Sequence, residues 1–355
     1  MSRNHSWITA LLLAGVACLS ACSTSPSHFA YVTLSSNQVA AYQVNDSSGA
    51  LAPLAGSPYP AGVFPTAIVV HPSGKFLYVA NNGEGDISLF TINAAAHTLL
   101  EVQPRTLSGT NPTSLAIRPD GNELFVSNSG SGTISFFSIN TKTGGLAQMS
   151  GSPFSCGVSP SALAISPANV LYVADSTSNV VFAFAIDGTT GGLTAVTGSP
   201  FNVGSNPTSL ALDASGHFLY VTNLLTNNMS AFAINSNGSL AVIPGSPFAT
   251  KASPISIAAA PSGEFIYVAN HGSNSISAFA LSSSGVPSPI AGSPFSVERG
   301  PVFVTPDVTG DFVFVGNGLS GNLSELSVNS SGALANVAQS PYATPATPAG
   351  LATTK

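Results

Sequence analysis

The chain has 355 residues, of which 44% are hydrophobic and only 6% are charged, where about 25% is usual in soluble proteins. Eight basic and fourteen acidic side chains give a formal net charge of −6. This composition excludes nucleic acid as a partner, because binding it needs clustered Lys and Arg, and it excludes intrinsic disorder, because the chain is rich in apolar residues.

The first 21 residues have the pattern of an export signal. Arg3 supplies a positive start, and residues 7–19 form an apolar run that is too short for a stable membrane-spanning helix. Leu19-Ser20-Ala21-Cys22 then matches the signal of bacterial lipoproteins, in which the Cys thiol receives the lipid. We expect residues 1–21 to be removed, Cys22 to be lipidated, and residues 22–28, which include His28, to form a tether. The alternative is an ordinary secretory signal followed by an incidental Cys.

A lipid on Cys22 predicts an exported protein that is anchored in the bacterial cell envelope and touches the membrane only through that lipid. Ser23 favours the outer membrane, on its periplasmic or its surface side. Cys18 leaves with the signal, so Cys156 is the one remaining thiol and no intrachain disulfide is possible. Sister repeats carry Ala61, Val203, Thr250 and Val297 at its position, and we expect Cys156 to be a small buried residue; the alternative is a reactive thiol.

The sequence Tyr-Val-Ala-Asn, or a close relative of it, recurs seven times at steps of 47 or 48 residues. The copies begin at Tyr31, Tyr78, Phe125, Tyr172, Tyr220, Tyr267 and Phe314. A Gly-Ser-Pro marker keeps the same step, at Gly56, Gly151, Gly198, Gly245 and Gly292. Such regular copies indicate one supersecondary unit repeated around or along an axis.

Residues 207–248 show what the unit contains. Apolar or β-branched runs at 207–212, 217–222, 229–234 and 240–248 are separated by Gly, Pro, Asn and Ser, which predicts four short strands. Four antiparallel strands repeated seven times predict an all-β fold, a seven-bladed β-propeller. The hairpin before each fourth strand carries Gly at 49, 144, 191, 238, 285 and 332, and His97 takes that place in the second blade, where we interpret it as a turn residue.

The two ends of the chain predict how the ring closes. The first copy lacks the strand that precedes the others, and residues 348–352 match that missing strand one period after residues 301–305. We therefore expect the C-terminus to supply the innermost strand of the blade whose other three strands are N-terminal. Residues 29–355 then form one domain, which we expect to be a monomer.

Most of the charges that could form a site fall in loops that should share one face of the ring, around the central channel. They are Glu84, Asp86, Asp175, Lys251, His271, Glu298 and Arg299. The last four belong to neighbouring blades, and a His beside a carboxylate and an Arg is sufficient for general base chemistry with anion stabilisation. The alternative is that these charges only keep the face soluble. His71 and His217 should lie on the opposite face and have packing or surface roles.

Motifs for cofactors are absent from the sequence. No His, Cys or carboxylate pair has metal-ligand spacing, and no Gly-rich loop precedes a helix, so we expect neither a metal nor another cofactor. Trp7 is the single tryptophan, and it lies in the signal.

With Tyr220-Val-Thr-Asn223 in its fifth repeat, the chain resembles the lactonase-type seven-bladed propellers, which include 6-phosphogluconolactonases and YVTN-repeat surface proteins. The resemblance covers residues 29–353. It implies hydrolysis of lactones by an Arg-His pair after the proline of strand one and an Asn-Glu pair at the end of strand two. The first position here holds pairs such as Thr66-Ala67 and Val302-Phe303, and the second holds pairs such as Asn81-Asn82 and Asn270-His271. No catalytic residue is therefore carried over.

Two functions from different classes remain open. The first is a binding or scaffolding module of the cell envelope that takes a small molecule, a sugar lactone or an envelope protein at the channel face. The second is a hydrolase of lactones or related esters that uses His271 and Arg299, with Glu298 beside them. Lyase-like and signalling roles are further alternatives.

Overall fold

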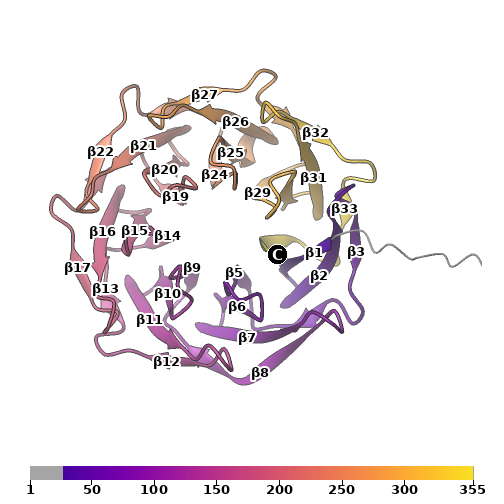
Figure 1. Ribbon diagram of the computed structural model, residues 1–355, viewed down its shortest axis with the longest axis horizontal. Helices are drawn as coiled ribbons and strands as arrows, with labels where there is room; N and C mark the ends of the chain where they lie inside the picture. Colours follow the sequence, from indigo (N-terminus) through magenta and orange to yellow (C-terminus); the bar gives the residue numbers. More distant parts are fainter. Residues whose placement is uncertain (1–26, 355) are drawn as a thin grey trace, which may run out of the picture.

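The computed structural model describes residues 27–354, which form a closed ring of seven β-sheets (Figure 1). The all-β class and the seven-bladed propeller predicted from the repeats are confirmed. The proposed signal, Cys22 and most of the proposed tether lie outside the described residues. Among residues 27–354, no helix has the length and apolar character that crossing a membrane requires.

Each blade is an antiparallel sheet whose strands follow one another from the centre of the ring to its rim (Figure 1). The innermost strands all begin at a proline: β5 (Pro65–Val70), β9 (Pro112–Ile117), β14 (Pro160–Ile165), β19 (Pro207–Leu212), β24 (Pro254–Ala259), β29 (Pro301–Pro306) and β34 (Pro348–Thr353). The second strands carry the Tyr-Val-Ala-Asn repeat: β1 (Ser27–Leu34), β6 (Phe76–Asn81), β10 (Glu123–Asn128), β15 (Val170–Asp175), β20 (Phe218–Asn223), β25 (Phe265–Asn270) and β30 (Phe312–Asn317).

The third strands are almost fully enclosed: β2 (Gln38–Asn45), β7 (Asp86–Asn93), β11 (Thr133–Ile139), β16 (Val180–Ile186), β21 (Asn228–Ile234), β26 (Ser275–Leu281) and β31 (Asn322–Val328). The fourth strands form the rim: β3 (Leu51–Pro53), β8 (Thr98–Leu107), β12 (Leu146–Gln148), β17 (Leu193–Ala195), β22 (Leu240–Val242), β27 (Pro287–Pro289) and β32 (Leu334–Asn336). Blade 1 contains β34 and β1–β3, blade 2 contains β5–β8, and blades 3 to 7 follow in chain order.

In six blades the rim strand is broken, whereas the sequence predicts one continuous fourth strand. After a turn, the chain returns to the third strand as a two-residue strand: β4 (Tyr59–Pro60), β13 (Phe154–Ser155), β18 (Phe201–Asn202), β23 (Phe248–Ala249), β28 (Phe295–Ser296) and β33 (Tyr342–Ala343). The break falls at the Gly-Ser-Pro marker, where Gly245, for example, has a φ of 89° and Pro247 has no N–H for the ladder. The marker's serine accepts a hydrogen bond from the third strand, as from the Ala231 N–H to Ser246 Oγ at 2.9 Å.

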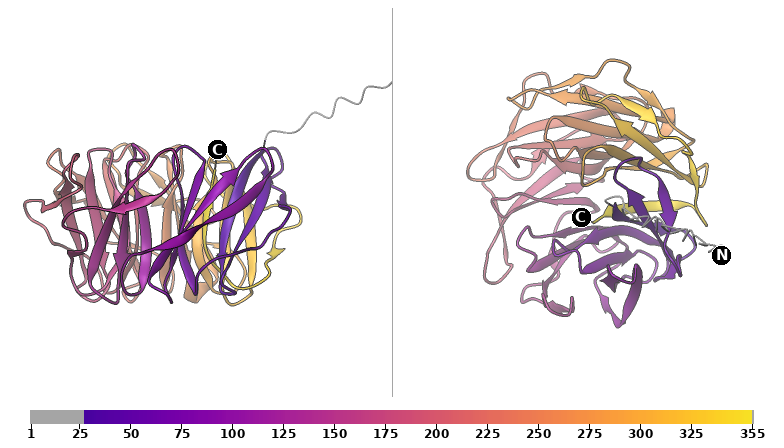
Figure 2. Two further views of the ribbon diagram at one scale, coloured as in Figure 1. Left: turned by 90° about the horizontal axis from the view of Figure 1, so that it is seen from below. Right: turned by 45° about the vertical axis from the view of Figure 1, so that its right-hand side comes forward.

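The predicted closure of the ring is confirmed. β34 pairs antiparallel with β1, with Val32 opposite Leu351, so β1 begins and β34 ends at the same face of the ring (Figure 2). β1 also begins earlier than the sequence suggests. His28 pairs with Val44, is 3% exposed, and bonds through Nδ1 to Asp46 Oδ1 at 2.7 Å. Its assignment to the tether is therefore wrong, because the strand ladder and this bond hold it in the domain.

The apolar core lies between the blades. Seven clusters of buried side chains each combine residues of two neighbouring blades, one cluster for each interface, which we call a seam. Four tyrosines of the repeat also cross a seam and donate a hydrogen bond to the hairpin glycine of the next blade: Tyr78 to Gly144, Tyr172 to Gly238, Tyr220 to Gly285 and Tyr267 to Gly332, at 2.7–3.2 Å.

The expected turn positions are also confirmed. The six hairpin glycines have φ between 67° and 83°, and His97 has a φ of 54° in the same place. Cys156 is 2% exposed and packs in the core between blades 3 and 4, as the sister repeats predict. Burial, with a smaller contribution from Asp175, raises the pKa of its thiol to about 12.

Candidate functional site

One face of the ring carries the loops between second and third strands and the loops that join successive blades; we call it the loop face. The asparagine that ends five of the seven repeats organises these loops. Asn81 accepts a hydrogen bond from the Gly62 N–H at 3.1 Å and donates to Asp86 at 2.7 Å and Ser88 at 3.0 Å. Asn128, Asn223, Asn270 and Asn317 donate to the third strand in the same way. Because the repeat has a constant step, the same asparagine contacts recur on this face and hold its loops in similar conformations.

Asp175 occupies the asparagine position in blade 4 and is fully buried. Its two carboxylate oxygens accept hydrogen bonds from the N–H groups of Val158, Ser159, Thr177 and Ser178, at 2.6–3.1 Å. Burial alone would raise the pKa of this carboxyl, but the backbone donors outweigh that effect and the pKa is lowered. All of these bonds lie within the loops, so the structure gives Asp175 a role in holding them.

Glu84 and Asp86 belong to a charged network in blade 2. Arg105 Nη1 lies 2.8 Å from Glu84 Oε2, and Arg105 Nε lies 2.7 Å from Glu101 Oε1. Asp86 is buried beside them, which raises its pKa, although the Asn81 side chain and Arg105 lower it in part. A cavity of about 350 Å³ adjoins the network and is lined by Glu84, Leu107, Ser108, Thr110 and Asn111, among others. Arg105 thus ties Glu84, on the loop between β6 and β7, to Glu101 on β8, and with one cation among three carboxylates the network stays negative when Asp86 is ionised.

Sequence reasoning missed Arg105 and Glu101. The available signal is that blade 2 lacks the Gly-Ser-Pro marker and has Gln103-Pro104 in its place. Without the break, β8 runs for ten residues and places Glu101 and Arg105 next to the third strand, where Ser88 Oγ donates to Glu101 at 2.7 Å.

Lys251, His271, Glu298 and Arg299 lie on neighbouring loops of the loop face, as the sequence predicts. His271 begins the short 3-10 helix η1 (His271–Ser273), and its N–H donates to the Ser253 carbonyl at 2.9 Å. The next loop joins this one through the Gly300 N–H and Asn274 Oδ1, at 2.8 Å. Within residues 27–354, however, no hydrogen bond or ion pair joins the side chains of the four residues; Glu298 instead accepts from Ser320 at 3.3 Å.

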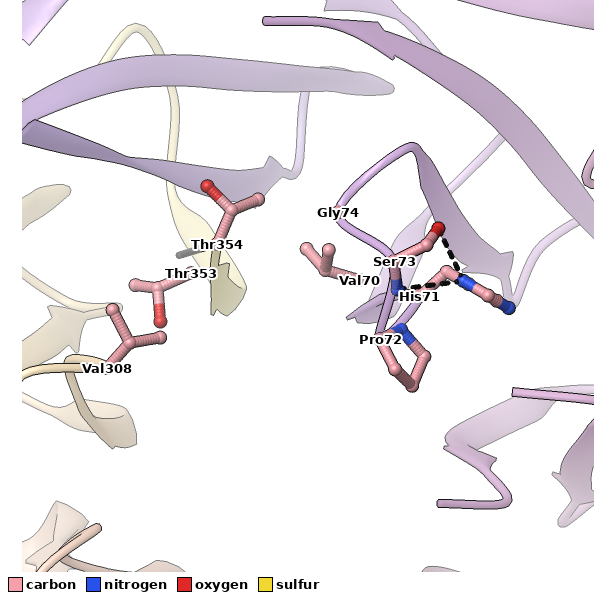
Figure 3. Close-up of a pocket in the computed structure, with 8 residues that line it drawn as sticks. All are labelled: Val70, His71, Pro72, Ser73, Gly74, Val308, Thr353 and Thr354. Carbon is pink, nitrogen blue, oxygen red and sulfur yellow. Dashed lines mark hydrogen bonds between the residues drawn. The ribbon is translucent and has the colours of Figure 1, made fainter. Parts of the chain in front are cut away.

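The opposite face carries the turns between first and second strands and is called the turn face. A cavity of about 330 Å³ opens there at the ends of the inner strands, lined by Val70, His71, Pro72, Ser73, Gly74, Val308, Thr353 and Thr354 (Figure 3). His71 bonds through Nδ1 to Ser73 Oγ and through Nε2 to the Gly121 carbonyl, both at 2.8 Å. Both ring nitrogens are occupied, so His71 has the packing role expected of it. Within the described residues, no three His, Cys, Asp or Glu side chains are arranged to hold a metal ion.

Comparison with known proteins identifies the family. The model of the family "Lactonase, 7-bladed beta-propeller" matches residues 24–157, 149–242 and 238–347. The chain belongs to this family. No curated protein sequence matches it.

Several solved structures are similar to this lactonase-family propeller. A putative 6-phosphogluconolactonase of Bacteroides fragilis has 18% identity and a TM-score of 0.82, over 94% of this chain and 99% of that one. The periplasmic gluconolactonase of Pseudomonas aeruginosa has 21% identity and a TM-score of 0.80, over 93% and 99%. A functionally unknown protein of Desulfotomaculum acetoxidans has 16% identity and a TM-score of 0.71, over 92% and 99%. At these identities the likeness shows the fold.

In this member of the lactonase family, the inner-strand positions where the resemblance implies an Arg-His pair have another role. Four consecutive blades carry a hydroxyl directly after the proline, and each donates to the proline carbonyl of the next blade: Thr66 to Pro112, Thr113 to Pro160, Ser161 to Pro207 and Thr208 to Pro254, at 2.8–3.3 Å. The other three blades carry Ile255, Val302 and Ala349. The four hydroxyls link neighbouring inner strands by hydrogen bonds, and the other three side chains are aliphatic. None of the seven is a base or a cation.

Proposed function

We propose that this protein is a lipid-anchored propeller of the cell envelope that binds a small molecule or an envelope protein on its loop face without hydrolysing it. One observation carries the proposal: the residues after the inner-strand prolines are hydroxyls bonded to the next blade or aliphatic side chains. Hydrolysis of a lactone needs a base that activates water and a donor for the oxyanion. Neither is present at those positions.

The position of the anchor supports the same proposal. Cys22 is five residues before Ser27, where β1 begins at the turn face. A chain spans at most about 3.5 Å per residue, so a lipid on Cys22 keeps the turn face within roughly 18 Å of the membrane. The loop face then points away from the membrane and is open to a partner in the surrounding compartment.

Hydrolysis of lactones or related esters is the second candidate. Membership of the family favours it, and so does the closeness of the loops that carry His271, Glu298 and Arg299. On this alternative, the imidazole of His271 acts as the base and Arg299 stabilises the oxyanion, after the ligand has drawn the side chains together.

An assay of the mature chain without lipid, residues 23–355, separates the two candidates. We expect no turnover of 6-phosphogluconolactone or of simple lactones above the spontaneous rate, and unchanged rates in the His271→Ala and Arg299→Ala variants. Turnover that both substitutions abolish would establish the hydrolase. Turnover that survives them would also overturn the binding proposal and would place the reaction elsewhere on the chain.

Anchoring is tested with Cys22→Ser in a bacterial host. We expect the parent protein in the membrane fraction, labelled by a fatty-acid probe, and the variant in the soluble fraction without label. Cys156→Ser is the matched control, because its thiol is buried and should take no lipid. Equal distribution of the parent and the Cys22 variant would contradict a lipid anchor.

A further inference from the structure

Glu325 is a buried acid with no counterpart in the other blades. It lies in β31, is fully buried, and neither carboxylate oxygen has a hydrogen-bond partner of acceptable geometry. In the strand pairing it stands opposite Phe314. The same position in the other six blades holds apolar side chains: Ala41, Leu89, Phe136, Ala183, Ala231 and Ala278. Blade 7 therefore carries an ionisable side chain at a position that holds an apolar residue in each of the other six blades.

The Glu325 carboxyl lies at the seam where the ring closes. Its Oε1 packs so closely on Gly49, the hairpin glycine of blade 1, that no Cβ would fit there. Leu89 and Phe136 pack in the same way on Gly144 and Gly191 of the blades that follow them. Glu325 thus makes the contact that a larger apolar side chain makes at two other seams, and it does so at the seam that joins the last blade to the first.

This seam also lacks the tyrosine link. At four seams a tyrosine hydroxyl donates to the carbonyl of the next hairpin glycine, and at the closing seam Phe314 stands in the tyrosine position. Phe314 has no hydroxyl to donate. A neutral carboxyl carries one O–H donor and can serve a carbonyl as a tyrosine does, whereas a carboxylate only accepts.

The groups around Glu325 disfavour its ionised form. Asp307 is fully buried on the turn between β29 and β30 and accepts from the N–H groups of Gly310 and Phe312, at 2.8 and 3.1 Å. His28 Nε2 on β1 lies 3.6 Å from Asp307 Oδ2, while its Nδ1 is held by Asp46. Burial above all, with Asp307, raises the pKa of Glu325 to about 8, and the nearby Tyr342 hydroxyl lowers it by a smaller amount.

We propose that Glu325 is a proton-dependent latch: its neutral carboxyl closes the seam between blades 7 and 1, and loss of its proton loosens that seam. The ionised carboxylate would be buried beside the second buried acid Asp307 with only the Tyr342 hydroxyl as a nearby donor, and a buried charge without an ionic partner is strongly destabilising. β1 and β34 are the strands that would lose support, because they close the ring without a covalent bond.

The direction of the pH dependence follows from linkage. The pKa of Glu325 is raised on folding from an unfolded value of about 4.3, so its stabilising contribution is complete below that pH and is lost as the pH rises toward about 8. Over that window, one proton changes the unfolding equilibrium constant by up to about tenfold per pH unit. The other titratable side chains contribute the same pH dependence of stability to the parent and to a variant with a neutral side chain at position 325.

The test compares the mature parent chain with Glu325→Gln, which keeps the size and a donor but cannot ionise. Denaturant unfolding from pH 4.5 to 9 should show the parent losing stability relative to the variant by up to about tenfold per pH unit. Amide hydrogen exchange at pH 9, corrected for intrinsic rates, should show β1 and β34 losing protection in the parent only, with β19 and β20 as the internal reference. Glu264→Gln, at an exposed position, should behave as the parent.

The double variant Phe314→Tyr/Glu325→Ala provides an independent arm, because it rebuilds the seam with the pair found at Tyr220 and Ala231. The stability of the double variant should be as insensitive to alkaline pH as that of Glu325→Gln. If Glu325→Gln fails to fold, the double variant still tests whether the acid makes the seam pH-sensitive. Parallel pH profiles for the parent and the variants, or a loss of protection spread evenly over all blades, would overturn the latch.

Discussion

Asp175 in blade 4 and Glu325 in blade 7 are both fully buried acids, and each replaces the residue that the repeat carries elsewhere. Asp175 stands in place of an asparagine among four backbone N–H donors, and its pKa is lowered. Glu325 stands in place of an alanine or a larger apolar residue with no satisfactory donor, and its pKa is raised. The donors around a buried acid therefore decide its charge state, and equal burial leads to opposite outcomes.

The largest effect that sharpens this comparison is expected from Asp175→Asn. Asparagine has a single acceptor oxygen, so about half of the loop N–H groups lose their partner, and we expect the free energy of unfolding at pH 7 to fall by about 1–3 kcal/mol. Because the pKa of Asp175 is lowered in the folded state, its contribution is present above the unfolded value of about 3.9 and is lost as the pH falls through the folded pKa. The parent and the variant should therefore converge in acid.

Denaturant unfolding between pH 2.5 and 7 measures this convergence. Asp311→Asn is a suitable control, because Asp311 is exposed and, within residues 27–354, its carboxylate accepts no hydrogen bond. A difference between parent and Asp175→Asn that stays constant down to pH 2.5 would mean that the carboxylate charge is not what holds the loops.

A smaller effect is expected from Tyr267→Phe, which gives the seam between blades 6 and 7 the aromatic residue that the closing seam already has. The Gly332 carbonyl would lose its donor, at 3.2 Å in the structure, and unfolding should become easier by about 1 kcal/mol. Unlike the Glu325 effect, this loss should be the same at pH 5 and pH 9, as measured by the denaturant midpoint. A pH-dependent loss would show that the tyrosine position itself, and not the acid, makes a seam sensitive to protons.

The sequence predicts what the repeats share. The step of the Tyr-Val-Ala-Asn copies gives the number of blades, the missing first strand gives the closure by residues 348–352, and the hairpin glycines give the positions of positive φ. These features recur, so each copy supports the interpretation of the others. The loops of His271 and Arg299 could be placed together for the same reason.

Features that occur once carry no such support. His28 precedes the first recognisable copy, and its partners Asp46 and Asp307 lie on other elements, so its burial has no signal in the neighbouring sequence. Glu325 falls at the step of the repeat that holds Ala231 and Ala278, so the sequence contains its position but not its burial or its neighbours. The partners of Arg105 become clear only when β8 is known to be continuous. Side-chain contacts of this kind depend on distances that periodicity does not contain.

The pairing of Val32 with Leu351 has a consequence for how the molecule is made. Synthesis proceeds from the N-terminus, so residues 27–53, which supply three strands of the first sheet, emerge long before residues 348–353, which supply its inner strand. Contacts between positions so distant in sequence form slowly. We therefore expect the ring to close late in folding, when the six-residue strand β34 pairs with β1.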